Sequence, residues 1–172
     1  VVGGSLGTRT LNNMMKSWIV TLGGEAPVQV IWQTGRYYEE EMRRFFETYP
    51  TKNISLVPFI DRMDYAYEVA DVVISRSGAC TVSELCLAKK PTLFVPSPNV
   101  AEDHQTKNAM ALVDKEAAMM VKDSEAADRG IATALKMVAN RELLSTLSEN
   151  IGKLAKPDAA DRVVDEILKW IK

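Results

Sequence analysis

Residues 71–88, "DVVISRSGACTVSELCLA", contain the signals of a strand, a turn and a helix in succession. The apolar, β-branched run at 71–75 is typical of a short buried strand, and "ELCLA" begins a helical pattern. Between them, "SRSGACT" gathers hydroxyl side chains around a glycine. A junction between two core elements does not need so many small polar groups. Small polar residues and glycine do allow the backbone to approach an anionic ligand closely, so this turn is a candidate anion-binding site.

The same alternation extends along the chain in both directions. It predicts strands at 1–2, 28–34, 54–59, 71–75, 92–97 and 117–121, helices at 9–22, 37–49 and 104–115, and two or three further helices in the tail. Continuous apolar strands between amphipathic helices predict an α/β fold. We therefore expect one domain over residues 1–172, a doubly wound parallel sheet with a helical C-terminal tail. "VV" before a glycine loop indicates the end of a strand, and we expect this chain to be a fragment of a longer protein.

The composition of the 172 residues excludes several classes of protein. With 47% hydrophobic residues, 26% charged residues and a net charge of −2, the chain is typical of a globular domain and lacks the basic excess of nucleic-acid-binding proteins. No run is long enough for a membrane-spanning helix. Two cysteines indicate a reducing compartment, and one histidine with two cysteines supplies too few ligands for zinc. We expect no metal and no cofactor.

Two loops that follow strands are candidate anion sites. Gly4 and Ser5 lie in "GGSLGT" (3–8), where glycines and a following helix could receive a phosphate, although a tight strand–helix turn also uses glycines. The second loop, "SGACTVSE", ends in Glu84, which could accept hydrogen bonds from both hydroxyls of a ribose. The alternative is a capping box between Thr81 and Glu84. Both interpretations of each loop remain open at this level.

A third polar loop, "EDHQTKNA", follows the strand at 92–97. His104 and Gln105 both donate and accept hydrogen bonds, which suits sugar hydroxyls; alternatively, Asp103 is a helix N-cap and His104 is solvent-exposed. Asp123 or Ser124 is predicted to cap the first tail helix. Five aromatic residues have the spacing of core residues: Trp18, Trp32, Phe45, Phe46 and Trp170.

Three segments together resemble one known family. "VVGGSLGTRTLN" (1–12), "FIDRMDYAYEVADVVISRSGACTVSEL" (59–85) and "KPTLFVPSPNVAEDHQTKNA" (90–109) resemble, in order and spacing, the carboxyl-terminal half of the bacterial cell-wall glycosyltransferases that make lipid II. These are the UDP-N-acetylglucosamine–N-acetylmuramyl-(pentapeptide) pyrophosphoryl-undecaprenol N-acetylglucosamine transferases. The resemblance is strongest from residue 1 to about 111. It implies the Rossmann-like donor half of a GT-B glycosyltransferase.

The resemblance implies a role for each candidate residue in binding UDP-N-acetylglucosamine. Ser5, beside Gly4, would contact the donor phosphate, and the backbone of Ile60 would pair with uracil. Glu84 would hold the ribose hydroxyls and Gln105 the sugar hydroxyls, whereas His104 stands where some relatives have a second glutamine. The remaining donor-binding segment is the turn and first helical residues, namely Gly78, Ala79, Cys80, Thr81, Val82 and Ser83.

The activity that the resemblance implies is inverting transfer of N-acetylglucosamine to the lipid-linked acceptor, lipid I. The acceptor loops, the general base and the peripheral contact with the cytoplasmic face of the inner membrane would belong to an amino-terminal domain that this chain does not contain. The isolated chain is therefore expected to bind donor without catalysing transfer. The alternatives are another GT-B transferase with a different UDP-sugar or lipid acceptor, an epimerase of the same architecture, and a non-catalytic nucleotide-binding module.

Overall fold

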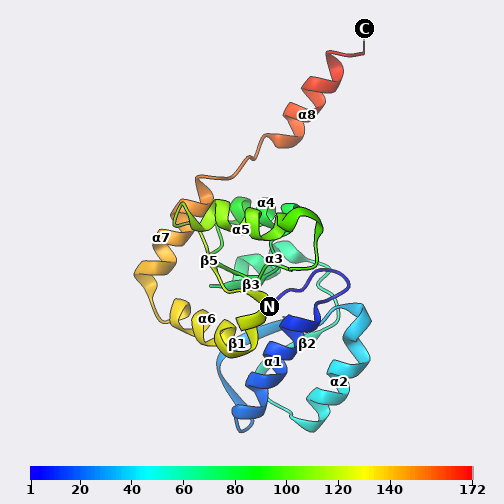
Figure 1. Ribbon diagram of the computed structural model, residues 1–172, viewed down its shortest axis with the longest axis vertical. Helices are drawn as coiled ribbons and strands as arrows, with labels where there is room; N and C mark the ends of the chain where they lie inside the picture. The colour runs from blue at the N-terminus through cyan, green and yellow to red at the C-terminus, as the bar shows by residue number, and fades with distance from the viewer. Residues whose placement is uncertain (172) are drawn as a thin grey trace.

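All strands of the computed structural model, which describes residues 1–171, run parallel (Figure 1). β1 (Glu25–Gln33) pairs with β2 (Lys52–Val57), and β3 (Val73–Ser75), β4 (Thr92–Phe94) and β5 (Met119–Met120) pair in that order. Val2 bridges the two groups, because it pairs with Gln33 of β1 and with Ser75 of β3. The order β2-β1-Val2-β3-β4-β5 confirms the predicted doubly wound sheet.

The two faces of the sheet bury two separate sets of side chains. Residues of β4 and the residue that follows it alternate between these two sets: Leu93 and Val95 belong to the core under α1 (Arg9–Thr21), and Phe94 belongs to the core under the other helical layer. This period of two is the geometry of a strand that is covered on both sides. The other helices are α2 (Glu39–Thr48), α3 (Met63–Val69), α4 (Ala79–Ala88), α5 (His104–Val113), α6 (Ile131–Val138) and α7 (Arg141–Gly152), with short helical turns η1 (Arg36–Tyr38), η2 (Ala101–Asp103), η3 (Asp123–Glu125) and η4 (Ala126–Gly130).

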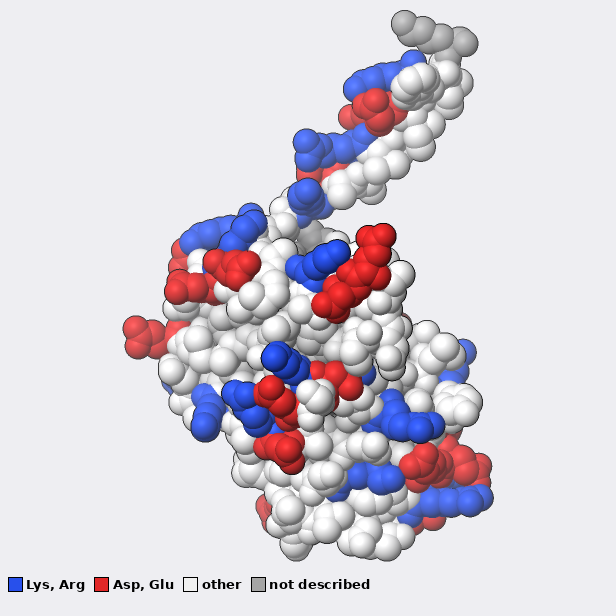
Figure 2. Space-filling model, in the orientation of Figure 1, with Lys and Arg blue, Asp and Glu red and all other residues white. Residues whose placement is uncertain are grey.

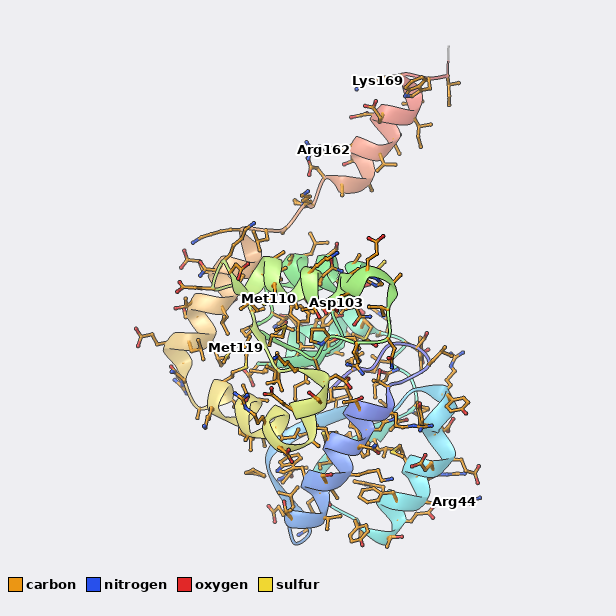
Figure 3. All side chains as sticks on the ribbon, viewed as in Figure 1. Arg44, Asp103, Met110, Met119, Arg162 and Lys169 are labelled. Atoms are coloured by element: carbon orange, nitrogen blue, oxygen red, sulfur yellow. The ribbon has the colours of Figure 1, made fainter. Side chains whose placement is uncertain are left out.

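The last helix, α8 (Ala159–Leu168), projects away from the rest of the chain (Figure 1). Arg162 and Lys169 extend to one side of it (Figure 3), and Figure 2 shows an uncharged face on the other side. Trp170 is 83% exposed, so the prediction that it is a core residue is wrong, whereas Trp32 is fully buried as predicted. Helical periodicity identified side chains that share a face, but nothing within the described residues covers that face.

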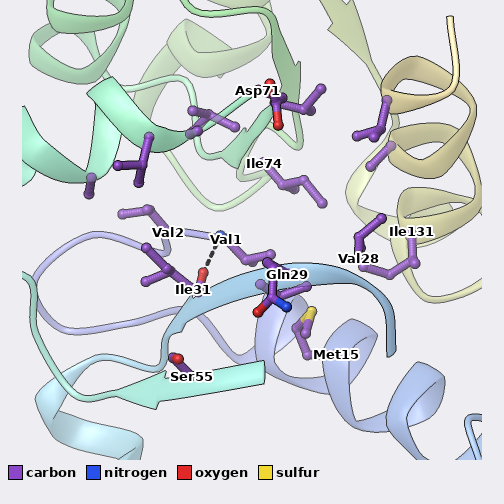
Figure 4. A pocket seen from close by; sticks show the side chains of 18 of the residues that line it. Val1, Val2, Met15, Val28, Gln29, Ile31, Ser55, Asp71, Ile74 and Ile131 are labelled. Carbon is purple, nitrogen blue, oxygen red and sulfur yellow. Dashed lines mark hydrogen bonds between the residues drawn. The ribbon is translucent and has the colours of Figure 1, made fainter. Parts of the chain in front are cut away.

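A cavity of about 470 Å³ lies in the plane of the sheet, between β1 and β3 (Figure 4). The Val1 amino group enters its edge and donates a hydrogen bond of 2.7 Å to the Ile31 carbonyl. Most of the lining residues are apolar, and β1, β3, α3 and α6 together contribute the majority of them. Within residues 1–171, Val2 alone bridges β1 and β3, and the cavity lies where these two strands do not pair. We therefore do not assign it as a ligand site.

Candidate functional site at the carboxyl edge of the sheet

The chain reverses its winding direction at Val2, between β1 and β3. In open α/β sheets, ligands bind outside the carboxyl ends of the strands at this reversal point. The glycine loop (3–8) leaves Val2 there, and the turn 76–78 leaves β3 beside it. Figure 1 shows the dark blue glycine loop and the green loop after β4 on the same side of the molecule. The topology therefore brings together the three loops that sequence analysis selected.

A buried glutamine holds the glycine loop in place. Gln33, which is 3% exposed at the end of β1, accepts a hydrogen bond of 3.1 Å from the Gly3 amide and donates one of 2.8 Å to the Gly4 carbonyl. Its amide nitrogen also lies 3.5 Å from the Pro58 carbonyl at the end of β2. Sequence analysis missed this residue, because it treated Gln33 only as part of a strand. A polar residue at the end of an apolar strand was the available signal.

The glycine loop packs directly on the turn that follows β1. Gly7 has φ +82°, and a Cβ atom on it would lie 2.0 Å from the Thr34 carbonyl oxygen. A Cβ atom on Gly35, in turn, would lie 2.1 Å from the Gly7 backbone. Gly4 has φ +81° but open space around it, and Ser5 beside it is solvent-exposed. The glycines are therefore needed for the turn itself as well as for any approach of a ligand.

Two helices begin at this edge with unpaired amides. In α1 the first backbone hydrogen bond is donated by the Asn12 amide to the Thr8 carbonyl. In α4 it is donated by the Val82 amide to the Gly78 carbonyl. No side chain caps either helix, and the amides of the first three residues of each find no acceptor within residues 1–171. These groups and the two helix dipoles favour an anion at this edge. Ala79 and Cys80, in the first turn of α4, are solvent-exposed.

The structure excludes the capping-box interpretation of Thr81. Gly78 is the N-cap of α4, so Thr81 is the third residue of the helix, and the Glu84 carboxylate lies one turn further along. Glu84 Oε2 instead accepts a hydrogen bond of 3.0 Å from the hydroxyl of Tyr67 in α3. Burial, together with the Glu84 carboxylate, raises the pKa of the Tyr67 phenol, which therefore donates at neutral pH. Glu84 Oε1 has no partner within residues 1–171.

Arg76 connects the loop after β3 to three other elements. Its Nη1 donates hydrogen bonds of 2.7 and 3.0 Å to the carbonyls of Val95 and Pro96 after β4, and lies 2.5 Å from Asp123 Oδ1. The other oxygen of Asp123 accepts from the Thr10 hydroxyl in the first turn of α1. The prediction that Asp123 or Ser124 caps the first tail helix is therefore wrong: the N-caps of η3, η4 and α6 are Lys122, Glu125 and Gly130, and the Asp123 carboxylate contacts Arg76 and Thr10 instead.

The loop after β4 and the start of α5 are tied to the same turn. The buried Ser77 hydroxyl donates a hydrogen bond of 2.8 Å to the Gln105 carbonyl. The Asn108 side-chain amide donates one of 3.0 Å to the Ser77 carbonyl. Gln105 Oε1 accepts from the Ser97 amide at 2.9 Å, which leaves its Nε2 group without a partner within residues 1–171. His104 is exposed, and its Nδ1 lies 2.9 Å from the Ala101 carbonyl.

Asp103 occupies the position before α5 in a left-handed conformation, but within residues 1–171 its side chain accepts no hydrogen bond from the start of that helix. Figure 3 labels this residue, which directly precedes His104 at the start of that helix. Ile60 lies in the loop between β2 and α3 and also lines the cavity in the sheet. Its amide and carbonyl have no hydrogen-bond partner within residues 1–171. Both groups are therefore available to a ligand, as pairing with a base requires.

The remaining features of the described residues concern metal ligands, membrane-spanning helices and charged surface patches. Within residues 1–171, no three His, Cys, Asp or Glu side chains converge as metal ligands do. In the same range, no helix is both long and apolar enough to cross a membrane. Positive and negative side chains alternate over the face shown in Figure 2, without a large patch of one sign.

A sequence profile of the glycosyltransferase family 28 C-terminal domain matches residues 1–163. The chain belongs to this family. It is 54% identical over 171 residues to the UDP-N-acetylglucosamine–N-acetylmuramyl-(pentapeptide) pyrophosphoryl-undecaprenol N-acetylglucosamine transferase of Parabacteroides distasonis, covering 99% of this chain and 46% of that protein. The enzyme of the same name from Porphyromonas gingivalis is also 54% identical, over 100% of this chain and 45% of its own length. The family 28 chain thus spans less than half of the curated relatives that it matches.

The fold of the family 28 domain is also found in a solved structure. The crystal structure of Acinetobacter baumannii MurG superimposes with a TM-score of 0.83 at 34% identity, covering 98% of this chain and 48% of that one. This likeness confirms the GT-B assignment of the fold that the three sequence segments implied.

Proposed function

We propose that this chain is the donor-binding half of an enzyme that transfers N-acetylglucosamine from UDP-N-acetylglucosamine to lipid I, giving lipid II for peptidoglycan. The observation that supports this most is the pair of uncapped helices at the reversal point, with Glu84 one turn inside α4. Two helix ends suit a diphosphate, and a carboxylate near them suits a ribose. The names of the relatives add the sugar and the acceptor.

The donor would lie across the carboxyl edge of the sheet. The diphosphate would meet Ser5 and the amides of α1 and α4, from the glycine loop to Thr81. Uracil would pair with the backbone of Ile60, whose amide and carbonyl are unpaired. The ribose would contact Glu84, and the N-acetylglucosamine unit would contact Gln105 through its unpaired Nε2, with His104 at the rim of the same loop.

The reaction supported by this arrangement is a displacement at the anomeric carbon. The C4 hydroxyl of the N-acetylmuramyl unit attacks that carbon, its proton passes to a base, and the bond to the diphosphate breaks with inversion. UDP leaves with the bonding electrons, so negative charge grows on the oxygens that face the helix ends. Fixed amides and helix dipoles stabilise charge at that point. The residues described supply this stabilisation, and the base and the acceptor site belong to the other half.

The cellular setting follows from the acceptor. Lipid I is carried by a membrane lipid, so the complete enzyme would act at the cytoplasmic face of the inner membrane. Contact with that surface would be made by the other half of the protein. The family 28 chain would bring donor to it.

Calorimetric titration of the 172-residue chain with UDP-N-acetylglucosamine, UDP-glucose and ADP tests the proposal. We expect UDP-N-acetylglucosamine to bind most tightly, UDP-glucose more weakly and ADP not measurably. Equal affinity for UDP-glucose would favour a transferase with a different donor, and equal affinity for ADP would favour a general nucleotide-binding module. We expect no lipid II synthesis by this chain alone, and measurable synthesis would contradict the division of roles between the halves.

A further inference from the structure

We propose that Tyr67 is a positioning residue for the donor's ribose, acting through Glu84; this role rests on the function proposed above. Tyr67 is 8% exposed, and its hydroxyl donates to Glu84 Oε2 at 3.0 Å. Glu84 itself lies on the exposed side of α4. The contact therefore joins a fixed, buried donor to a carboxylate that faces solvent.

An exposed glutamate side chain samples many rotamers, and holding it in one geometry for a ligand costs entropy. The Tyr67 ring packs in the core with Val73, Leu85 and Phe94, so its hydroxyl has a fixed position. By occupying one carboxylate oxygen, it orients the other oxygen, Oε1, which has no partner within residues 1–171. The Glu84 carboxylate is thus held in place before any ligand arrives.

The chemistry of the pair also suits a diol. Burial raises the pKa of Tyr67, so the phenol stays protonated and donates at neutral pH. An ionised carboxylate accepts more than one hydrogen bond, so Oε1 and the free lone pair of Oε2 remain available to two vicinal hydroxyls. Because α3 begins shortly after the loop that contains Ile60, the same contact links the proposed uracil and ribose positions.

The test compares two ligands that differ only at the ribose. The full chain and its Tyr67→Phe variant are titrated with UDP and with 2′-deoxyuridine diphosphate. We expect Tyr67→Phe to weaken UDP binding about threefold to tenfold, because the ligand must then immobilise the Glu84 side chain itself, at the usual cost for one side chain. We expect its affinity for the deoxy ligand to change less than twofold, because one of the two hydroxyls that Glu84 would hold is absent.

A matched control lies on the same helix. Tyr65 is 62% exposed and stacks on the Arg62 guanidinium at 4.0 Å, away from Glu84. Tyr65→Phe should bind both ligands as the unsubstituted chain does. In a Glu84→Ala background, Tyr67→Phe should cause no further loss of UDP affinity, because the group that it positions is already removed.

The outcomes distinguish failure of the positioning role from failure of the proposed function. Unchanged UDP affinity, equal losses for both ligands, or loss of folding in Tyr67→Phe would overturn the positioning role and leave only a structural bond between α3 and α4. Failure of the unsubstituted chain to bind UDP would overturn the proposed function and this role with it. UDP binding by the unsubstituted chain thus separates the two failures.

Discussion

Replacing Asp123 by Asn removes one charge from the network that joins the candidate loops. Asp123 Oδ1 lies 2.5 Å from Arg76 Nη1, and its other oxygen accepts from the Thr10 hydroxyl. Asparagine has the same shape and keeps an acceptor for Thr10. With its oxygen toward Thr10, the asparagine turns its amide nitrogen toward Arg76, so the substitution removes both the charge and the acceptor from that contact, with little change in volume.

The expected cost follows from how deeply the pair is buried. Exposed ion pairs contribute about 0.2–1 kcal/mol, whereas breaking a fully buried pair costs about 3–5 kcal/mol. The side chains of Arg76 and Asp123 are 13% and 23% exposed, which lies between these limits. We expect Asp123→Asn to lower the free energy of unfolding by about 2 kcal/mol.

Urea and thermal denaturation of the chain measure this cost. For a domain of this size, a loss of 2 kcal/mol lowers the melting temperature by about 4–8 °C and the urea midpoint by about 1 M. The control is Glu41→Gln, which breaks the pair between Lys16 and Glu41 on the surface. That pair is 3.0 Å long with side chains 29% and 60% exposed, so its loss should cost about 0.5 kcal/mol or less.

Equal melting shifts in the two variants would refute the reasoning. They would mean that the Arg76–Asp123 pair is worth no more than a surface pair, and that the carbonyls of Val95 and Pro96 hold Arg76 by themselves. A larger shift in Asp123→Asn with an unchanged control would support the ion pair as the link between α1 and the loops after β3 and β4.

Three further predictions concern the site. Glu84→Gln should weaken UDP binding by about 1–3 kcal/mol, the range for hydrogen bonds to charged groups, and calorimetry showing unchanged affinity would remove the ribose role. Gln105→Ala should cost about 1 kcal/mol for UDP-N-acetylglucosamine and nearly nothing for UDP, whereas Ser5→Ala should weaken both alike; equal losses in Gln105→Ala would place that loop at the wrong end of the donor. Gly7→Ala should destabilise the fold by at least about 2 kcal/mol because of its positive φ and the close Thr34 carbonyl, against about 1 kcal/mol for Gly4→Ala; equal melting temperatures would contradict the close packing.

Corrections to the sequence predictions have a common cause. The capping box at Thr81, the capping role of Asp123 and the core position of Trp170 were each inferred from local spacing. Spacing along a helix states which side chains share a face or a turn. It does not state which distant group competes for them. Arg76 pairs with Asp123 in place of a helix start, and Tyr67 pairs with Glu84 in place of the capping box.

The sequence by itself determined the order of strands and helices and the loops that share one edge, because burial on two faces requires continuous apolar strands and because parallel strands end on one side. It also identified the glycine loop, the turn after β3 and the loop after β4. Only the tertiary structure decided how these loops are held together. Gln33 clamps the glycine loop, Arg76 joins three elements, and Tyr67 holds Glu84, each through a hydrogen bond between groups that are 17 or more residues apart. Such bonds depend on distances in the folded chain, and no local pattern of residues encodes them.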